Sequence, residues 1–246
     1  MEKQQIGPHT LYCGDCLEIL PTLATGIADH AITDPPFGAQ THAGAQTGTN
    51  GGEQLVFFDP ITAQQCTDVF EQLTLRICKR WVIATIEWRH ALELEKRGIL
   101  VRLGVWVKPN GAPQFTGDRP GTGWEAVAIC HRSGRKRWNG GGHHATWRFC
   151  KTEGEHPTQK PVELITKWID QFTDIGDTIL DPYMGSGTTI VACAHTGRRG
   201  IGIEISREYF DIACRRIEEA EGVGSLFEQP QPEQRTLLDA LESAHA

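Results

Sequence analysis

Residues 179–189 read ILDPYMGSGTT, an apolar run followed by a glycine-rich turn and the start of a helical pattern. Glycine lets the backbone approach a ligand closely, and the first turn of a helix offers unpaired N–H groups. The stretch is neither a P-loop, which requires Gly-Lys-Ser or Gly-Lys-Thr, nor the G-x-G-x-x-G fingerprint. Glu204 lies 17 residues after Gly187 in the next apolar run, where an acidic residue suits the two hydroxyls of a ribose. The pattern favours a nucleotide-like ligand over a plain strand-to-helix turn.

Segments typical of strands and of helices alternate along the chain around this turn. Apolar runs predict strands, and apolar residues spaced three or four apart predict helices. This alternation favours an α/β fold, in which helices cover both faces of a mostly parallel sheet. The predicted strands are residues 11–13, 27–33, 81–86, 100–107, 127–131, 178–180 and 200–205, and the predicted helices are 16–23, 61–80, 89–97, 161–172, 188–195 and 207–219.

A second candidate site follows the strand predicted at 27–33. The sequence Asp34-Pro35-Pro36-Phe37 forms a rigid turn, because two prolines end both helices and strand ladders. Open α/β sheets place their chemistry at the carboxyl ends of strands. A carboxylate and a proline carbonyl could accept hydrogen bonds from both N–H groups of an exocyclic amine on a nucleic-acid base, and could stabilise the positive charge that develops on its nitrogen during a reaction. The aromatic ring of Phe37 could stack on the same base. The alternative is an ordinary proline turn.

Together these motifs resemble those of the amino-methylating DNA methyltransferases that use S-adenosylmethionine. Residues 11–18 (LYCGDCLE) resemble the family's N-terminal Gly-Asp segment, residues 156–161 (HPTQKP) the segment before its cofactor strand, and residues 199–205 (RGIGIEI) its ribose strand. The Asp-Pro-Pro-Phe motif precedes the glycine-rich turn, which is the circularly permuted motif order of the beta group. The resemblance covers roughly residues 10–220.

The resemblance implies a Rossmann-like, S-adenosylmethionine-dependent methyltransferase fold. Its sheet would be mostly parallel, with seven strands of which one is antiparallel, and with helices on both faces. The strand predicted at 11–13 would lie on the cofactor side of that sheet. The 246 residues would form a single methyltransferase domain, with a C-terminal tail at about 221–246 that ends in a short helix near 236–243.

The resemblance also implies a role for each matching residue. Asp34 and the Pro35 carbonyl would hold the target amino group and Phe37 would stack on the base, so that the predicted catalytic set is Asp34, Pro35, Pro36 and Phe37. Within the cofactor site, Asp15 would lie near the adenine ring, Glu204 near the ribose, the glycine-rich turn near the methionine part, and Thr158 and Lys160 near its carboxylate. The predicted cofactor-binding set is Asp15, Cys16, Thr158, Lys160, Asp181, Pro182, Gly185, Ser186, Gly187, Thr188, Glu204 and Ile205.

The expected reaction is site-specific methylation of the N6 amino group of adenine in double-stranded DNA. The base would leave the duplex, and transfer from S-adenosylmethionine would be direct and in line. Within the family, Asp at position 34 favours adenine and Ser favours cytosine, but N4 of cytosine is chemically similar and stays open. Two further alternatives are a methyltransferase for RNA or a protein amide, and a catalytically silent DNA-binding protein. The family also leaves open a homodimer and a restriction-modification role, and the sequence indicates no obligate protein partner.

A basic segment lies between the two motif halves. Residues 131–151 contain no Asp or Glu, and basic side chains neutralise DNA phosphates or read guanine. We therefore expect a target-recognition insert at about 132–155, with the alternative of a solvated basic loop. The predicted DNA-binding residues are Arg132, Arg135, Lys136, Arg137, Arg148 and Lys151. The polar loop at 38–54 could close over the flipped base, or could be a linker.

Composition and sequence pattern argue against a general polyanion-binding protein, a membrane-spanning protein and a secreted protein. There are 31 acidic and 24 basic residues, a net charge of −7, so any contact with DNA must come from a local patch. Since no apolar run approaches the length of a membrane span and the N-terminus lacks a signal-peptide pattern, we expect a cytoplasmic protein of a bacterial or phage-infected cell. The eight cysteines are scattered along the chain, and in a cytosolic protein they are expected to be reduced thiols. A lone Cys13-x-x-Cys16 is weak as a zinc motif, so no metal is predicted.

Overall fold

The computed structural model describes residues 2–36, 62–111, 118, 120–152 and 159–227. These residues contain a nine-stranded sheet with the strand order β1-β2-β9-β8-β3-β4-β6-β5-β7. The strands are β1 (Glu2–Ile6), β2 (His9–Cys13), β3 (His30–Thr33), β4 (Trp81–Ile86), β5 (Leu100–Val107), β6 (Trp124–His131), β7 (Thr146–Arg148), β8 (Thr178–Asp181) and β9 (Arg199–Glu204).

The seven central strands have the predicted arrangement. β2, β9, β8, β3 and β4 are parallel neighbours, and β6 runs antiparallel between β4 and β5. β2 pairs with β9, which confirms its predicted place on the cofactor side. The sheet has two more strands than predicted, because β1 and β7 extend its edges. Both lack the apolar run of a central strand, since β1 is largely exposed and β7 has three residues.

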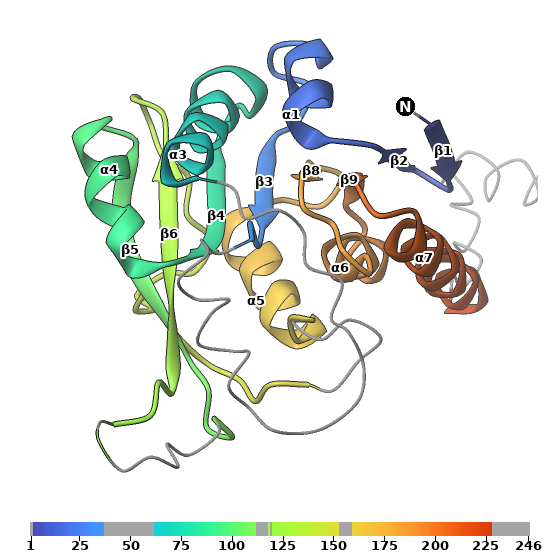
Figure 1. The fold of residues 1–246 in the computed structure, drawn as a ribbon. Coiled ribbons are helices and arrows are strands. Elements are labelled where there is room, and N and C mark those ends of the chain that lie inside the picture. The colour runs from blue at the N-terminus through green and yellow to red at the C-terminus, as the bar shows by residue number, and fades with distance from the viewer. Residues whose placement is uncertain (1, 37–61, 112–117, 119, 153–158, 228–246) are drawn as a thin grey trace, which may run out of the picture.

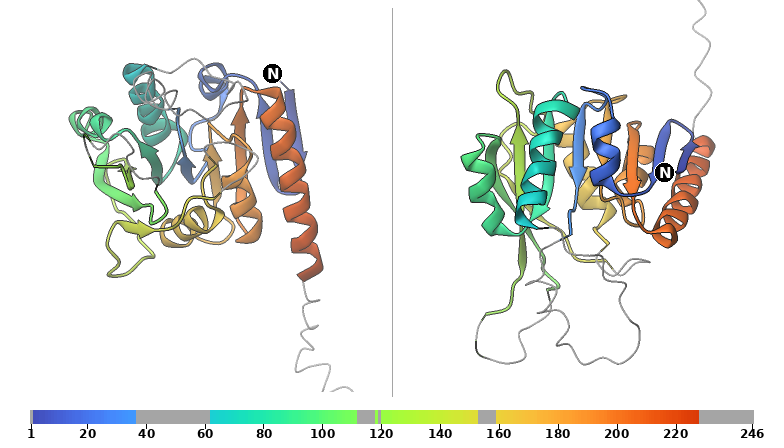
Figure 2. Two further views of the ribbon diagram at one scale, coloured as in Figure 1. Left: turned by 60° about the horizontal axis from the view of Figure 1, so that its bottom comes forward. Right: turned by 45° about the horizontal axis from the view of Figure 1, so that its top comes forward.

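Helices cover both faces of the sheet, as predicted (Figures 1 and 2). One face packs against α1 (Cys16–Ile19), α3 (Ala63–Gln72) and α4 (Ala91–Lys96). The other face packs against α5 (Val162–Phe172), α6 (Thr188–His195) and α7 (Arg207–Phe227). The buried core is therefore divided between two layers, and the sheet edges are left for function.

Three predicted helices differ in detail from the structure. The helix predicted at 61–80 is α3 followed by a π turn at Leu73–Ile77, and it ends before β4. The helix predicted at 16–23 is α1 followed by a 3₁₀ turn at Leu20–Thr22, because Pro21 lacks the N–H that would continue the α-helix. The helix predicted at 89–97 begins as a 3₁₀ turn at Trp88–His90 and continues as α4.

The last helix runs further than the helix predicted at 207–219. The structure has α7 running to Phe227, through residues that the sequence assigned to the tail starting at 221. Glu221 on α7 accepts a hydrogen bond from the buried His9 ring at 2.9 Å, which anchors this part of the helix to β2. The helix predicted near 236–243 lies outside the described residues. Across the described ranges, no helix is long and apolar enough to cross a membrane.

The strand directions define two edges of the sheet. We call the edge where β3, β4, β8 and β9 end the carboxyl edge, and the opposite edge the amino edge. Because β6 is antiparallel to β4, with Ile86 opposite Ala126 and Trp81 opposite His131, β6 begins at the carboxyl edge and ends at the amino edge. The residues that precede β6 therefore lie at the carboxyl edge, and the residues that follow it lie at the amino edge.

Candidate active site

Asp34 follows β3 at the carboxyl edge, where protein groups hold both of its carboxylate oxygens. Thr85 on β4 donates its hydroxyl to Oδ1, and Lys160 donates to Oδ2 at 2.5 Å. The Asp34 side chain is 25% exposed to solvent, whereas the Lys160 side chain is 9% exposed. A carboxylate in this setting is fixed in direction but still open to a ligand. Pro35 is buried and Pro36 half-buried beside it.

Lys160 is shared between two carboxylates. Its ammonium also lies 3.5 Å from Glu125 on β6, and the residue directly precedes Pro161, the N-cap of α5. Burial raises the pKa of Asp34, as does the charge of Glu125, and Lys160 opposes both effects. Burial alone would lower the pKa of Lys160, but the charges of Asp34 and Glu125 outweigh burial and raise it. The expected contact of Lys160 with a cofactor carboxylate stays a prediction. In the structure this ammonium contacts the carboxylates of Asp34 and Glu125.

Asp181 ends β8, next to Asp34 in the sheet. It accepts a hydrogen bond from Thr33 on β3 at 2.6 Å and from the backbone of Tyr183 at 3.1 Å. Burial raises the pKa of Asp181 to about 6, against the opposing effect of these hydrogen bonds and one from Thr189. The pair of Thr33 and Asp181 joins the Asp-Pro-Pro motif to the strand of the glycine-rich turn.

Glu204 ends β9 and holds the glycine-rich turn. Its two oxygens accept backbone N–H bonds from Gly185 and Ser206, each at 2.8 Å. Burial raises the pKa of Glu204 and these two N–H groups oppose the rise. Each carboxylate oxygen can accept a second hydrogen bond, so the predicted contact with ribose hydroxyls stays open and remains a prediction.

The glycine-rich turn packs closely against α7. Gly187 has φ +87° and a Cβ there would lie 3.0 Å from the Cβ of Ala213, so any other residue would be strained and crowded. Ser186 is buried and donates to Gln159 at 3.0 Å, and Arg216 on α7 donates to the Ser186 hydroxyl at 2.8 Å. Gln159 directly precedes Lys160, so this chain of contacts joins the turn to the Asp34 site.

The remaining members of the predicted cofactor set lie at the same edge. Asp15 follows β2 and caps α1 by accepting from the Leu17 N–H at 2.8 Å, and Gly14 donates to the Glu204 carbonyl at 2.9 Å. Cys16, Pro182 and Thr188 are buried around the turn, whereas Ile205 is 55% exposed. Phe37, Thr158 and the loop at 38–54 lie outside the described residues, so their predicted roles remain predictions.

The six basic residues predicted to bind DNA do not form one patch. Arg132, Arg135, Lys136 and Arg137 follow the end of β6 at the amino edge, where Arg137 pairs with Asp174 at 2.9 Å. Arg148 ends β7 beside Val107 at the carboxyl edge, and the Lys151 N–H binds Asn110 there at 2.7 Å. The eight-residue strand β6 separates the two groups by about 23 Å. The segment predicted as one insert at 132–155 therefore spans both edges, and its residues 153–155 lie outside the described part of the chain.

Sequence reasoning missed three residues of the cluster around Asp34. Thr85 lies in the strand predicted at 81–86 as apolar core, whereas Lys108 and Glu125 lie just outside the strands predicted at 100–107 and 127–131. Lys108 directly follows β5 and Glu125 is the second residue of β6. A lysine and a glutamate beside apolar runs are a signal in the sequence, but their location at one edge of the sheet depends on the antiparallel direction of β6.

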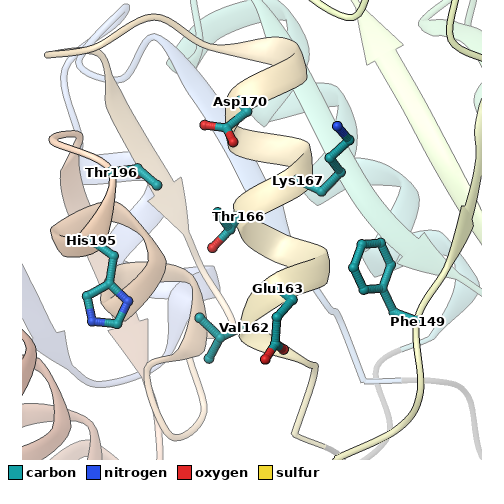
Figure 3. Close-up of a pocket in the computed structure, with 8 residues that line it drawn as sticks. All are labelled: Phe149, Val162, Glu163, Thr166, Lys167, Asp170, His195 and Thr196. Atoms are coloured by element: carbon teal, nitrogen blue, oxygen red, sulfur yellow. The ribbon is translucent and has the colours of Figure 1, made fainter.

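A shallow pocket of about 670 Å³ lies away from this site (Figure 3). It opens over α5, beside the end of α6, and none of its described lining residues belongs to the predicted catalytic or cofactor sets. Its lining residues are Phe149, Val162, Glu163, Thr166, Lys167, Asp170, His195 and Thr196. The carboxyl edge, not this pocket, carries the candidate chemistry.

Comparison with known proteins agrees with this geometry. The sequence model of the DNA methylase family, which comprises N6 and N4 methyltransferases, matches residues 28–215. The type II methyltransferase M.HinfI of Haemophilus influenzae is 28% identical over 89% of this chain and 71% of its own length. The type II methyltransferase M.Cfr9I of Citrobacter freundii is 35% identical over 54% of this chain. The aligned region spans about half (49%) of that relative's length.

Solved structures extend the likeness to the fold. The complex of M1.HpyAVI with S-adenosylmethionine has a TM-score of 0.62 and 25% identity, covering 84% of this chain and 98% of that protein. The cytosine-N4-specific PvuII DNA methyltransferase has a TM-score of 0.67 over 90% of this chain and 93% of its own, at 14% identity, which supports the fold alone. With the family model spanning both motif halves, the chain belongs to the N6/N4 DNA methylase family of S-adenosylmethionine-dependent DNA methyltransferases.

Proposed function

We propose that the protein transfers a methyl group from S-adenosylmethionine to the N6 amino group of adenine in double-stranded DNA. The observation that carries the proposal is the Asp34 carboxylate. It is held by Thr85 and Lys160 and is still a quarter exposed. Asp34 lies at the end of the strand next to β8, whose glycine-rich turn would bind the cofactor.

The residues at the ends of β8 and β9 fit the chemical groups of S-adenosylmethionine. Glu204 offers carboxylate oxygens suited to ribose hydroxyls, and the exposed Ile205 offers an apolar surface suited to the adenine ring. Asp181 and the N–H groups of the turn would face the methionine part. When bound, the cofactor supplies an electrophilic methyl group on a sulfonium.

Asp34 would act on the target amine by accepting one of its N–H bonds, and the Pro35 carbonyl would accept the other. These bonds align the nitrogen lone pair with the methyl carbon and stabilise the positive charge that develops on nitrogen. A nitrogen–carbon bond forms as the sulfur–carbon bond breaks, and a proton then leaves the nitrogen. No covalent bond to the protein is required. Because the amine is buried in duplex DNA, the base would have to flip out.

The base specificity rests on a narrower argument. Asp at position 34, the first residue of the motif, supports adenine through the family resemblance. The fold shared with the cytosine-N4-specific PvuII enzyme keeps N4 of cytosine as the second candidate. Arg148 and Lys151 are the proposed phosphate contacts at the carboxyl edge, and Arg132, Arg135, Lys136 and Arg137 would contact only DNA that reaches the amino edge.

One experiment tests the proposal. Purified protein is incubated with unmethylated DNA and S-adenosylmethionine, the DNA is digested to nucleosides, and the products are identified by mass spectrometry. N6-methyladenine is expected, and N4-methylcytosine would overturn the base assignment while keeping the site. An unmodified DNA pool, with cofactor binding shown by calorimetry, would point to another substrate or to a silent DNA-binding protein.

A further inference from the structure

Behind Asp34 lies a row of four alternating charges. Lys160 contacts Asp34 at 2.5 Å and Glu125 at 3.5 Å, and Lys108 contacts the other oxygen of Glu125 at 2.8 Å. The four side chains come from the end of β3, the segment before α5, the start of β6 and the end of β5. Four segments distant in sequence thus converge on one line of charge.

The row is embedded in the protein. The side chains of Lys108 and Lys160 are 8% and 9% exposed to solvent, and that of Glu125 is 20% exposed. Both ammonium groups lie over the buried ring of Trp106, at 5.4 and 5.7 Å from its centroid. Ion pairs in such a place depend strongly on every member, because removing one partner leaves a buried charge uncompensated.

We propose that Glu125 is a positioning residue for methyl transfer, which shares the Lys160 ammonium with Asp34 and so keeps the Asp34 carboxylate available to the target amine. The inference rests on the proposed function, because it assigns Asp34 the role of acceptor. If the Lys160 ammonium were paired with Asp34 alone, it would bind the Asp34 carboxylate more tightly, and this carboxylate would be a weaker acceptor for a ligand. Because the Lys160 ammonium also interacts with Glu125, its interaction with Asp34 is weaker. The Lys108 ammonium compensates the charge of Glu125.

The charges around Asp34 predict how the row affects protonation. Lys160 and Thr85 favour the ionised carboxylate, while burial and the charge of Glu125 raise its pKa. Asp181 on the neighbouring strand is a further carboxyl group close enough for its pKa to be raised by Asp34, and Lys108 contacts only Glu125 among the carboxylates of the row. Removing the charge of Glu125 should therefore lower the pKa of Asp34, because a like charge nearby disfavours the ionised form.

The test compares the wild-type protein with Glu125→Gln, which keeps the size of the side chain and removes its charge. We expect kcat to fall about ten- to a hundredfold through misplacement of the acceptor, with the Kd values for S-adenosylmethionine and DNA unchanged. The acid limb of the pH–rate profile should move to lower pH. Glu93→Gln is the matched control, since Glu93 forms an exposed pair with Lys96 on α4, and it should change neither quantity.

A second readout does not require activity. The ¹³C carboxyl resonance of Asp34, assigned by its loss in Asp34→Asn, is titrated in wild type and in Glu125→Gln. A lower pKa in the variant supports the inference, and an unchanged pKa overturns it. If the wild-type protein methylates no DNA, the proposed function fails, while this titration still decides whether Glu125 acts on Asp34.

A double variant separates action through Lys160 from general damage. In a Lys160→Gln background, Glu125 no longer shares an ammonium with Asp34, so adding Glu125→Gln should cause no further loss in kcat. A full additional loss in the double variant would mean that Glu125 acts independently of Lys160, which would overturn the proposed route. Circular dichroism and the melting temperature show whether each variant is folded.

Discussion

Two charged clusters lie at opposite ends of β3 and β4. The carboxyl-edge cluster comprises Asp34, Thr85, Lys108, Glu125 and Lys160. The amino-edge cluster comprises His30, Arg80, Arg137, Asp174 and Asp177. Both contain carboxylates bound by cationic side chains and both join the same strands, so the kind of interaction alone does not distinguish them.

The clusters differ in what their carboxylates contact. A single oxygen of Asp177 binds three protein donors, the His30 ring at 3.0 Å, Arg80 at 3.2 Å and the Asp174 N–H at 2.8 Å. Among the described residues, Asp34 has one donor on each oxygen. Its side chain is 25% exposed, close to the 19% of Asp177 and the 29% of Asp174, so the number of donors on one oxygen, and not exposure, distinguishes the two clusters. The amino-edge cluster therefore holds the strands together, whereas the carboxyl-edge cluster retains an acceptor for a ligand.

The largest effect should follow from neutralising the acceptor at the carboxyl edge. Asp34→Asn should lower the rate of methyl transfer by at least about 10²–10³-fold, because one preorganised electrostatic contact is typically worth this much in the transition state. Single-turnover kinetics at saturating cofactor and DNA measure the loss. Calorimetric affinity for S-adenosylmethionine should stay within a few-fold of wild type, and wild-type activity in this variant would disprove the assigned role of Asp34.

The matching change at the amino edge should affect folding instead of chemistry. Asp177→Ala removes the partner of the fully buried His30 and one partner of Arg80. We expect a loss of about 2–3 kcal/mol in the free energy of unfolding, below the range for fully buried pairs because Asp177 is partly exposed. Urea denaturation measures it.

At a temperature where Asp177→Ala remains folded, its kcat should equal that of wild type. A fall in kcat comparable to that of Asp34→Asn, without a loss of stability, would remove the distinction between the two clusters. Asp170→Ala, an exposed change on α5 whose partner Arg198 lies at 3.7 Å, serves as the control for substitution of an aspartate.

The His30 ring makes the amino-edge cluster sensitive to acid. Burial lowers the pKa of His30 to about 4, against the opposing effect of Asp177. Between pH 6.5 and 4 the unfolded chain binds a proton at this histidine and the folded protein does not, so stability falls as the pH falls. At about pH 5.5 the loss relative to about pH 7.5 should be about 1.4 kcal/mol.

The measurement is the difference in unfolding free energy between wild type and His30→Gln at the two pH values. Asp181 acts in the opposite direction, since its pKa raised to about 6 makes the folded state bind the extra proton, and His9 adds to the effect of His30 because burial lowers its pKa as well. Both groups are present in the two proteins, so their contributions cancel. An equal pH dependence in His30→Gln would show that His30 does not titrate as expected.

Much of the carboxyl edge could be predicted from local sequence. The strand at 81–86 and the helix at 188–195 match their predicted bounds, because an apolar run or an apolar period is a property of neighbouring residues. The Asp-Pro-Pro turn and the glycine-rich turn were recognisable for the same reason. Their joining through Thr33 and Asp181 follows from two parallel strands lying side by side.

The direction of β6 could not be predicted in the same way. Strand direction is set by pairing with β4 and β5, which are distant in sequence, and the apolar pattern of a strand is the same in both directions. This one reversal brings Glu125 to Lys160 and takes Arg135 away from Asp34. The polar strand β1 was missed for a different reason, because an edge strand needs few apolar residues.

The smallest effect concerns DNA and follows from the same reversal. Arg148→Ala with Lys151→Ala removes two exposed charges at the carboxyl edge, and Arg135→Ala with Lys136→Ala removes two at the amino edge. If the duplex lies against the carboxyl edge, the first double variant should reduce the slope of log K against log salt by about 0.9 for each phosphate that the protein no longer neutralises. The second double variant, which changes the charge by the same amount, should leave the slope near the wild-type value.

Fluorescence anisotropy from about 50 to about 200 mM salt measures both slopes. Equal reductions would mean that the DNA reaches across both edges, so that β6 separates two parts of one binding surface instead of a binding surface from a structural one.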